Sequence, residues 1–425
     1  MMRLAVIFES SPFDRKGLFN AVHNRVKHLL ATGECTIDVF CVHSRDNAFT
    51  RRVRHTPEVP SVDETVVDGI RYRLLWYRFS ILDNVLLEKL HVRPWLFRRF
   101  MESHVDLLKG YDAVIAHSFC GGLFALAAHE RFGIPYYVTW HGSDVHTHPW
   151  RVPVILEDTR AVMESARCNF FVSRALLDAS EKIISNARKE VLYNGVSEDF
   201  VKYSLEDRAA VRERYGLAPE DKVVAFVGNI VKVKNVLSLP EIFAQVAKGY
   251  DGPLKFWIIG DGKLRKPLEA TMDLSFRPNE VSGEISFFGN QPSPAMPDIM
   301  NCIDVLVLPS LNEGLPLVCA EALSCGAAVV GSDVGGIAEV IGKDNVVPLV
   351  VPNDTDTFPG FPSGPLICTG QEMGNSGRPY DDSFVNGMTE KVVAALTGQS
   401  PFQTLPADIS WARTAALELS ILKSL

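Results

Sequence analysis

The chain has 425 residues, more than a single hydrophobic core usually holds, so we expect two domains. Hydrophobic residues make up 47% and charged residues 22%, which is typical of a globular protein and excludes a disordered or fibrous one. The net charge of −8 argues against a general nucleic-acid-binding protein.

The N-terminus and the cysteines indicate the compartment. The first residues, MMRLAVIFESSPFDR, hold only about six apolar residues before Glu9, too few for a signal peptide or a membrane span. The eight cysteines form no CxxC pair and mostly lie in apolar runs, so we interpret them as buried thiols. We therefore expect a cytoplasmic protein whose contact with a membrane, if it has one, is peripheral.

In the first half of the chain, short β-branched runs alternate with amphipathic stretches, a pattern typical of a parallel sheet with crossover helices. Strands are expected at residues 3–9, 36–42, 112–118, 135–141, 169–173 and 190–195. Helices are expected between them, at residues 20–32, 121–133 and 154–166. The run ETVVDGIRYRLLWYR predicts a hairpin that turns at Asp68-Gly69.

A polar helical segment, residues 204–222, has few large apolar side chains and precedes a new strand, so we place the domain boundary near it. The first domain is expected over residues 1–205 and the second over 206–405, followed by a helix within 406–425. Strands of the second domain are expected to begin near Lys222, Lys255, Ile285, Val305 and Ala327.

The predicted fold class is therefore α/β, with two Rossmann-like doubly wound domains that face a central cleft with the carboxyl edges of their sheets. Residues 351–382 are rich in Pro, Gly, Asn and Ser and lack periodicity, which is typical of an irregular surface loop.

Two glutamates, Glu313 and Glu321, flank an expected helix N-terminus in NEGLPLVCAEALSCG. Pro316 suits the first turn of this helix, because its missing N–H would be unpaired there. The amides around that turn and the positive end of the helix dipole form a site for an anion such as a diphosphate. This arrangement fits a ligand with hydroxyl groups on both sides of a diphosphate, such as a nucleotide sugar. The alternative is that Glu313 only complements the dipole and Glu321 pairs with a structural arginine.

The run from FFGNQPSPAMPDIMNCIDVLVLPS through NEGLPLVCAEALSCGAAVVGSDVGGIAEVIG resembles the donor domain of the retaining glycosyltransferases of family 4, which have the GT-B fold. Glu313 and Glu321 match the Glu–x7–Glu motif of that family. The runs FVGNIVKVKN, IIGDGKLR, HGSDVH and VLYNGVSEDF extend the resemblance over most of the chain. It implies that Glu313 contacts the transferred sugar and Glu321 the ribose. The C-terminal helix, by the same resemblance, would pack back on the first domain.

The resemblance implies three catalytic residues, His141, Lys234 and Glu313. Lys234 would stabilise negative charge on the departing nucleoside diphosphate. The usual arginine of the family is Asn229 here, so either Lys232 compensates or the helix terminus contributes more of that stabilisation. The donor-binding residues that it implies are Gly17, Asp144, Gly228, Asn229, Lys234, Gly260, Gly262, Asn290, Glu313, Gly314, Leu315, Leu317, Val318 and Glu321. The plainer alternatives are a solvated lysine at Lys234, a strand-end histidine at His141 and an ordinary turn glycine at Gly17.

Two motifs invite a metal site, and we expect neither to bind one. His141, His146 and His148 are clustered, but their spacing is not that of a helical zinc-binding pair. The run Asp354-Thr355-Asp356 resembles a metal-binding DxD motif, but it lies in the expected loop without the context of that motif. We therefore expect no metal and no cofactor, the nucleotide sugar being a substrate.

The implied function is transfer of a sugar, with retention of configuration, from a nucleotide-sugar donor to a glycan, a lipid-linked acceptor or a small molecule in polysaccharide or glycoconjugate synthesis. UDP is the expected nucleotide, from its frequency in the family. The alternative enzyme is a nucleotide-sugar epimerase with the same two domains. A two-domain binding protein is disfavoured because no signal peptide is recognised, and a dehydrogenase because no strand precedes GxGxxG.

The segment LLEKLHVRPWLFRRFMESHVDLLKG, residues 86–110, mixes arginines with Trp95, Phe97 and Phe100. Such a segment suits an interfacial surface for a membrane or a lipid-linked acceptor. The alternative is a core-packing helix with an exposed basic edge.

Overall fold

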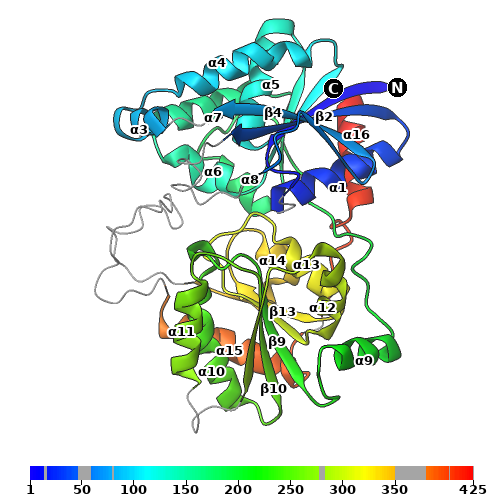
Figure 1. The fold of residues 1–425 in the computed structure, drawn as a ribbon, viewed down its shortest axis with the longest axis vertical. Helices are drawn as coiled ribbons and strands as arrows, with labels where there is room; N and C mark the ends of the chain where they lie inside the picture. Colours follow the sequence, from blue (N-terminus) through cyan, green and yellow to red (C-terminus); the bar gives the residue numbers. More distant parts are fainter. Residues whose placement is uncertain are drawn as a thin grey trace. The chain divides into compact units, whose positions relative to one another are not determined.

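A computed structural model describes residues 1–13, 17–45, 59–78, 81–276, 283–349, 380–401 and 403–424. The described residues form two compact units (Figure 1). Unit 1 holds residues 1–194 together with 410–424, and unit 2 holds residues from 195 to 409. The division after Asn194 comes earlier than the boundary at residue 205 that the sequence analysis placed.

Unit 1 contains an eight-stranded sheet with helices between its strands. Its elements are β1 (Met2–Glu9), α1 (Gly17–Ala31), β2 (Cys35–Arg45), β3 (Glu64–Val67), β4 (Ile70–Arg78), α3 (Ile81–Leu90), α4 (Trp95–His104), η1 (Val105–Leu108), β5 (Ala113–His117), α5 (Ser118–Phe132), β6 (Tyr136–Trp140), α6 (Ser143–His146), η2 (His148–Trp150), α7 (Pro153–Ser165), β7 (Cys168–Phe171), α8 (Arg174–Ser180), β8 (Lys189–Val191) and α16 (Trp411–Ser424). The strand order is β3-β4-β2-β1-β5-β6-β7-β8.

The predicted hairpin of unit 1 is confirmed. Strands β3 and β4 pair antiparallel, whereas the other neighbouring strands of this sheet pair parallel. Asp68 and Gly69 connect them with φ angles of 47° and 81°, the left-handed conformation that a two-residue hairpin turn requires.

Helix α16 comes last in the chain and packs on α1 in unit 1 (Figure 1). Alternate residues of β1, Leu4, Val6 and Phe8, share a buried core with apolar residues of both helices. Within this core, Arg25 Nε of α1 donates a hydrogen bond of 2.5 Å to Glu418 Oε2 of α16. The two side chains are 2% and 0% exposed, so this is a fully buried ion pair.

Unit 2 contains a six-stranded sheet. Its elements are α9 (Leu205–Arg214), β9 (Lys222–Val227), η3 (Lys232–Lys234), η4 (Val236–Ser238), α10 (Leu239–Gly249), β10 (Leu254–Ile259), α11 (Arg265–Ser275), β11 (Glu284–Gly289), η5 (Ser293–Ala295), α12 (Met296–Cys302), β12 (Val305–Leu308), α13 (Leu317–Ser324), β13 (Ala328–Ser332), α14 (Ile337–Ile341), η6 (Lys343–Asn345), β14 (Val346–Val347) and α15 (Asp382–Leu396). All pairs are parallel, in the order β11-β10-β9-β12-β13-β14. The order reverses between β9 and β12, the position where ligands of open α/β sheets usually bind.

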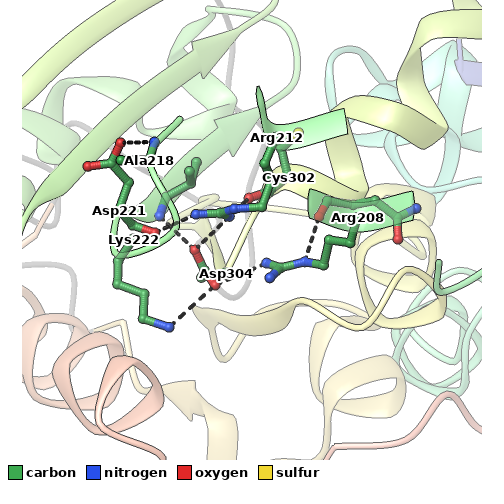
Figure 2. Close-up of polar contacts among 9 residues, drawn as sticks. Arg208, Arg212, Ala218, Asp221, Lys222, Cys302 and Asp304 are labelled. Atoms are coloured by element: carbon green, nitrogen blue, oxygen red, sulfur yellow. Dashed lines mark hydrogen bonds and ion pairs between the residues drawn. The ribbon is translucent and has the colours of Figure 1, made fainter. Parts of the chain in front are cut away.

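Helix α9 belongs to unit 2 because its arginines bind the start of β12 (Figure 2). Arg208 and Arg212 reach the two oxygens of Asp304 at 3.1 and 3.3 Å, and Arg212 also donates to the Cys302 carbonyl at 2.6 Å. Asp304 accepts from the Val223 amide at 2.8 Å as well. This network attaches the polar helix to unit 2, which is why the unit begins before that helix.

The expectation for residues 86–110 needs correction. Residues 86–110 were expected as one segment, but α3 and α4 are separate helices and none of the ten residues of α4 is buried. Phe97 and Phe100 of α4 nevertheless pack against the buried Phe124 of α5, while Arg98 and Arg99 are exposed, which agrees with the alternative of a packing helix with an exposed basic edge. Among the helices that the structure describes, none has both the length and the hydrophobicity to cross a bilayer.

Candidate active site

The loops that follow β9 and β12 bring Lys234 and Glu313 together. Lys234 lies in the 3₁₀ helix η3 after β9, and Glu313 follows β12. The Leu311 amide donates a hydrogen bond of 2.8 Å to the Val233 carbonyl, which joins the two loops next to these side chains. Both residues therefore sit where the strand order of unit 2 reverses.

Glu313 is held by a cation and a hydroxyl group. Lys234 Nζ and Ser310 Oγ both donate to Glu313 Oε1, at 2.5 and 2.7 Å. The lysine and glutamate side chains are 20% and 10% exposed, so the pair is shielded from most of the solvent. Within the described residues, Glu313 Oε2 accepts no hydrogen bond, which leaves this oxygen available to a ligand.

The helix N-terminus beside Glu313 lacks a capping side chain. Pro316 is the N-cap residue of α13, one position before the first turn where the sequence analysis placed it. In the part of the chain that the structure describes, the amides of Leu315, Leu317 and Val318 donate to no acceptor. These N–H groups and the positive end of the helix dipole suit an anionic group.

The neighbouring loop fixes the backbone that precedes α13. The Gly336 amide donates to the Gly314 carbonyl at 3.0 Å. A Cβ atom on Gly335 would lie 1.9 Å from the Glu313 carbonyl oxygen, so only glycine allows this approach. The position of Gly314 therefore depends on a glycine pair that the sequence analysis did not single out.

Glu321 lies inside α13 among the buried side chains of Cys319, Ala320 and Ala322. Burial raises its pKa to about 7, so the carboxyl group keeps its proton to a higher pH than an exposed glutamate does. No ion pair joins Glu321 to any described residue, so the structural arginine of the alternative interpretation is not found there. A carboxyl group in this state suits hydrogen bonds to hydroxyl groups, either as acceptor or as donor.

The glycines of FVGNIVKVKN and IIGDGKLR allow two loops to touch. Gly228 and Gly260 have φ angles of 155° and 127°, and a Cβ atom on Gly260 would lie 2.0 Å from the Gly228 carbonyl oxygen. A Cβ atom on Gly262 would lie 2.3 Å from the Ile230 carbonyl oxygen. The close packing of the two loops therefore explains these glycines independently of any ligand.

Three further side chains of unit 2 lie at the surface. Asn229, where the family usually has arginine, and Lys232 are both exposed after β9, and Asn290 is exposed after β11. The residue after Lys234, Asn235, takes the left-handed conformation with φ 49°. The lysine thus sits at the start of a sharp turn of the backbone.

In unit 1, His141 pairs with His117, a residue that the sequence analysis missed. His117 Nδ1 and His141 Nε2 lie 3.0 Å apart, so one ring donates a hydrogen bond to the other. Burial and the nearby charge of Arg25 lower the pKa of His141 to about 3 and that of His117 well below its usual value. Both rings are therefore neutral at physiological pH, and each tautomer depends on the other.

Asp144 holds the loop that carries His141. Its carboxylate accepts from the amides of His141 and Gly142, at 3.0 and 2.8 Å, while burial raises its pKa. Gly142 has a φ of 144°, which this turn needs. The structure thus gives Asp144 contacts within its own loop.

The other residues of unit 1 that the sequence analysis discussed are Gly17 and the histidines His146 and His148. Gly17 begins α1 with φ 32°, is exposed, and a Cβ atom there would meet nothing within 4 Å. Burial lowers the pKa of both His146 and His148 to about 4. Over the described ranges, no group of three or more His, Cys, Asp or Glu side chains could hold a metal ion, and Asp354-Thr355-Asp356 lies outside those ranges.

Besides the glycine pair, the sequence analysis missed two side chains, Ser310 and His117. Each stands at or just beyond the carboxyl end of a predicted strand, in VLVLPS and DAVIAHS, and that position was the available signal. Neither belongs to a motif with a recognisable spacing, so only the structure identifies its partner.

Comparisons with known proteins agree with this architecture. A family model described as glycosyl transferases group 1 matches residues 221–359, and one described as a glycosyl transferase 4-like domain matches residues 17–195. Together the two models match most of the chain.

Two curated relatives are similar over part of the chain. The putative teichuronic acid biosynthesis glycosyltransferase TuaC of Bacillus subtilis is 30% identical over 55% of this chain and 56% of its own length. The N-acetyl-α-D-glucosaminyl L-malate synthase of Bacillus anthracis is 28% identical over 56% of this chain and 59% of its own. The matched region thus spans somewhat more than half the length of these relatives.

Solved structures share the fold over the whole chain. Sucrose-phosphate synthase from Thermosynechococcus elongatus has a TM-score of 0.66 at 16% identity, covering 100% of this chain and 95% of its own. Anabaena HepE, solved in complex with UDP and glucose, has a TM-score of 0.61 at 15% identity and is covered completely, as is this chain. The two domain models and the two parallel-sheet units show that the chain belongs to the glycosyltransferases of the family 4 type and has the GT-B fold.

Proposed function

We propose that the protein transfers a sugar, with retention of configuration, from a nucleotide-sugar donor to a glycan, a lipid-linked acceptor or a small molecule. A UDP-sugar is the first candidate for the donor. The observation that carries the proposal is the Lys234–Glu313 pair next to the uncapped N-terminus of α13. The amides of Leu317 and Val318 would bind the diphosphate, and Glu321 the ribose hydroxyl groups. Glu313 would bind hydroxyl groups of the transferred sugar.

In this mechanism the ammonium group of Lys234 has two tasks. It neutralises Glu313 before the donor binds, and it has further N–H donors for a phosphate oxygen afterwards. As the sugar–phosphate bond breaks, Lys234 and the helix N-terminus stabilise the growing charge on the diphosphate. The acceptor hydroxyl would then attack from the same face of the sugar, with a departing phosphate oxygen taking its proton, so no metal ion is required.

The names of similar proteins support the substrate class. The names of relatives mention teichuronic acid biosynthesis, N-acetyl-α-D-glucosaminyl L-malate and D-inositol 3-phosphate. Structural neighbours were solved with UDP, with UDP-glucose and with UDP-2-fluoro glucose. On the basis of these similar proteins, we propose that this chain also uses a nucleotide-sugar donor.

The first experiment is a thermal-shift screen of nucleoside diphosphates and their sugars. A ligand at 100 times its dissociation constant stabilises the protein by about 2.7 kcal/mol, which is readily detected. Turnover of the identified donor is then compared between the wild type, Glu313→Gln and Glu213→Gln. Glu213 is an exposed residue of α9 in the same unit and serves as the matched control.

We expect Glu313→Gln to lower kcat by at least about a hundredfold. Nucleotide binding should persist, because Glu313 is proposed to contact the sugar and not the nucleotide. Glu213→Gln should match the wild type, and EDTA should leave turnover unchanged. Unchanged turnover of Glu313→Gln would refute the role of this residue. Conversion of the donor sugar with no acceptor present would identify an epimerase instead.

A further inference from the structure

The exposed apolar side chains of the protein are concentrated on α3, on α4 and on the turn between them. Of the sixteen large hydrophobic residues that are exposed in the described part of the chain, seven lie between residues 81 and 96. Leu82 and Leu90 are each 66% exposed and Trp95 is 60% exposed. We call this set of seven the apolar hairpin face: Ile81, Leu82, Val85, Leu90, Val92, Trp95 and Leu96.

The two helices are anchored to unit 1, so this exposure is not a consequence of loose packing. Asp83 Oδ2 of α3 accepts a hydrogen bond of 2.9 Å from the Leu96 amide at the start of α4. Arg93, in the turn, pairs with Glu157 and Asp158 of α7 at 2.9 and 2.8 Å. These contacts fix the two ends of the turn.

The inner sides of the helices pack on the unit. Leu87 of α3 shares a small core with Val152 and Ile155. Phe97 and Phe100 of α4 each lie edge-on to Phe124 of α5, with ring centroids 6.3 and 5.8 Å apart. Each helix therefore packs some of its apolar side chains on the unit and leaves those of the apolar hairpin face exposed; Figure 1 shows where the two helices lie in unit 1.

Cations accompany the apolar hairpin face, while the acidic side chains of the two helices are already engaged. Asp83 binds the Leu96 amide, Glu88 pairs with Arg151, and Glu102 pairs with Arg98. Lys89 and Arg99 are exposed, and neither forms an ion pair within the described ranges. The guanidinium group of Arg99 lies 5.5 Å above the Trp95 ring.

Exposed apolar side chains, a tryptophan and cations without an ion pair on the same two helices match the two layers of a lipid surface. Aliphatic and aromatic side chains enter the boundary of the acyl chains, and lysine or arginine side chains bind the anionic headgroups. The chain as a whole carries a charge of −8, so its overall charge would oppose this attraction and the cations must act locally. We propose that the apolar hairpin face docks on an anionic membrane surface.

The test is flotation of the full-length protein with vesicles of neutral lipid and with vesicles containing anionic lipid, with no sugar substrate present. One variant, Leu82→Gln/Trp95→Gln, removes the apolar contacts, and a second, Lys89→Glu/Arg99→Glu, reverses the cations. Their controls lie in unit 2: Leu205→Gln, at a residue 87% exposed, and Lys248→Glu/Lys266→Glu, at two exposed lysines. All these positions are exposed, so the variants should fold, and thermal melting checks this.

We expect the wild type to float with anionic vesicles and much less with neutral ones. Because each lysine or arginine near such a surface changes binding by about fivefold, the charge-reversal variant should bind more than tenfold more weakly. The apolar variant should also lose binding, and the controls should behave as the wild type. The binding of the wild type should fall as salt is added.

Two results would overturn the proposal. One is a failure of the apolar hairpin face to bind, seen either as no binding of the wild type to anionic vesicles at low salt or as equal binding of the wild type and both variants. The other is a concentration-dependent dimer that both hairpin variants abolish, without vesicle binding, which would make the face a contact between two copies. Neither result depends on sugar transfer, so the proposed function is tested separately.

Discussion

The ionisation of Glu321 makes the stability of the fold depend on pH. Its pKa rises from 4.5 to about 7 in the folded chain because the carboxylate loses its hydration among apolar neighbours. The folded state therefore holds a proton that the unfolded state releases between pH 4.5 and 7, and Glu321 destabilises the fold progressively as pH rises through this range.

We predict that Glu321→Gln, which does not ionise, becomes more stable relative to the wild type as pH increases from 4.5 to 7. The difference should grow by about 3 kcal/mol, since each unit of pKa shift corresponds to 1.36 kcal/mol, and should then stay constant. Urea unfolding at several pH values measures it. A difference that is independent of pH would show that Glu321 ionises in the folded state as it does in water.

The site residues differ in how far the sequence could identify them. Glu313 and Lys234 belong to runs with a recognisable spacing, and the structure brings them to within 2.5 Å of each other. His117 acts through a contact with the loop after another strand, and Ser310 through a contact with Glu313 three residues along, and neither residue belongs to a recognisable motif. Gly260 was predicted for ligand binding, whereas its clearest task in the structure is the close approach to Gly228.

At the scale of the element, that approach makes the loop after β10 intolerant of a side chain. We predict that Gly260→Ala destabilises unit 2 by more than about 3 kcal/mol, because its Cβ atom would lie 2.0 Å from a backbone oxygen and its φ of 127° is strained. Thermal or urea unfolding measures the loss.

The matched control for this substitution is Gly216→Ala. Gly216 also has a positive φ, 73°, but a Cβ atom there meets nothing within 4 Å. It should cost only about 1–2 kcal/mol, the strain of the left-handed conformation alone. Equal losses for the two variants would mean that the contact with Gly228 relaxes at little cost.

The strands of both sheets were predictable because buried parallel strands read as continuous apolar runs, such as LAVIF in β1 and VLVL in β12. Strand β14 has only two residues, Val346 and Val347, too few to form a pattern. Residues 86–110, which hold the second half of α3 and the whole of α4, were read as one segment because they are rich in apolar residues, and their sequence does not reveal which of these are exposed. Exposure depends on what the rest of the chain covers.

At the scale of the whole molecule, the buried pair of Arg25 and Glu418 joins the two ends of the chain. Both terminal nitrogens of Arg25 and Oε1 of Glu418 find no hydrogen-bond partner among the described residues, so each charge depends on the other. We predict that Glu418→Ala costs about 3–5 kcal/mol, because it leaves an uncompensated buried cation.

The double variant Arg25→Met/Glu418→Leu should be more stable than Glu418→Ala, since two apolar side chains remove both charges together. Calorimetry of the wild type, Glu418→Ala and the double variant measures their free energies of unfolding and tests this order. If the double variant is as unstable as the single one, the packing volume rather than the charge governs this contact.

The return of α16 to unit 1 also has a consequence for the order of events during synthesis. The sheet of unit 1 begins with β1, but its core receives Ala415, Leu419 and Leu422 only after the residues of unit 2 have been synthesised. Unit 2, which lies between these parts in sequence, is complete earlier. Of the two units, unit 1 therefore starts to emerge from the ribosome first and closes its core last, and until then it exposes the apolar surface that α16 covers.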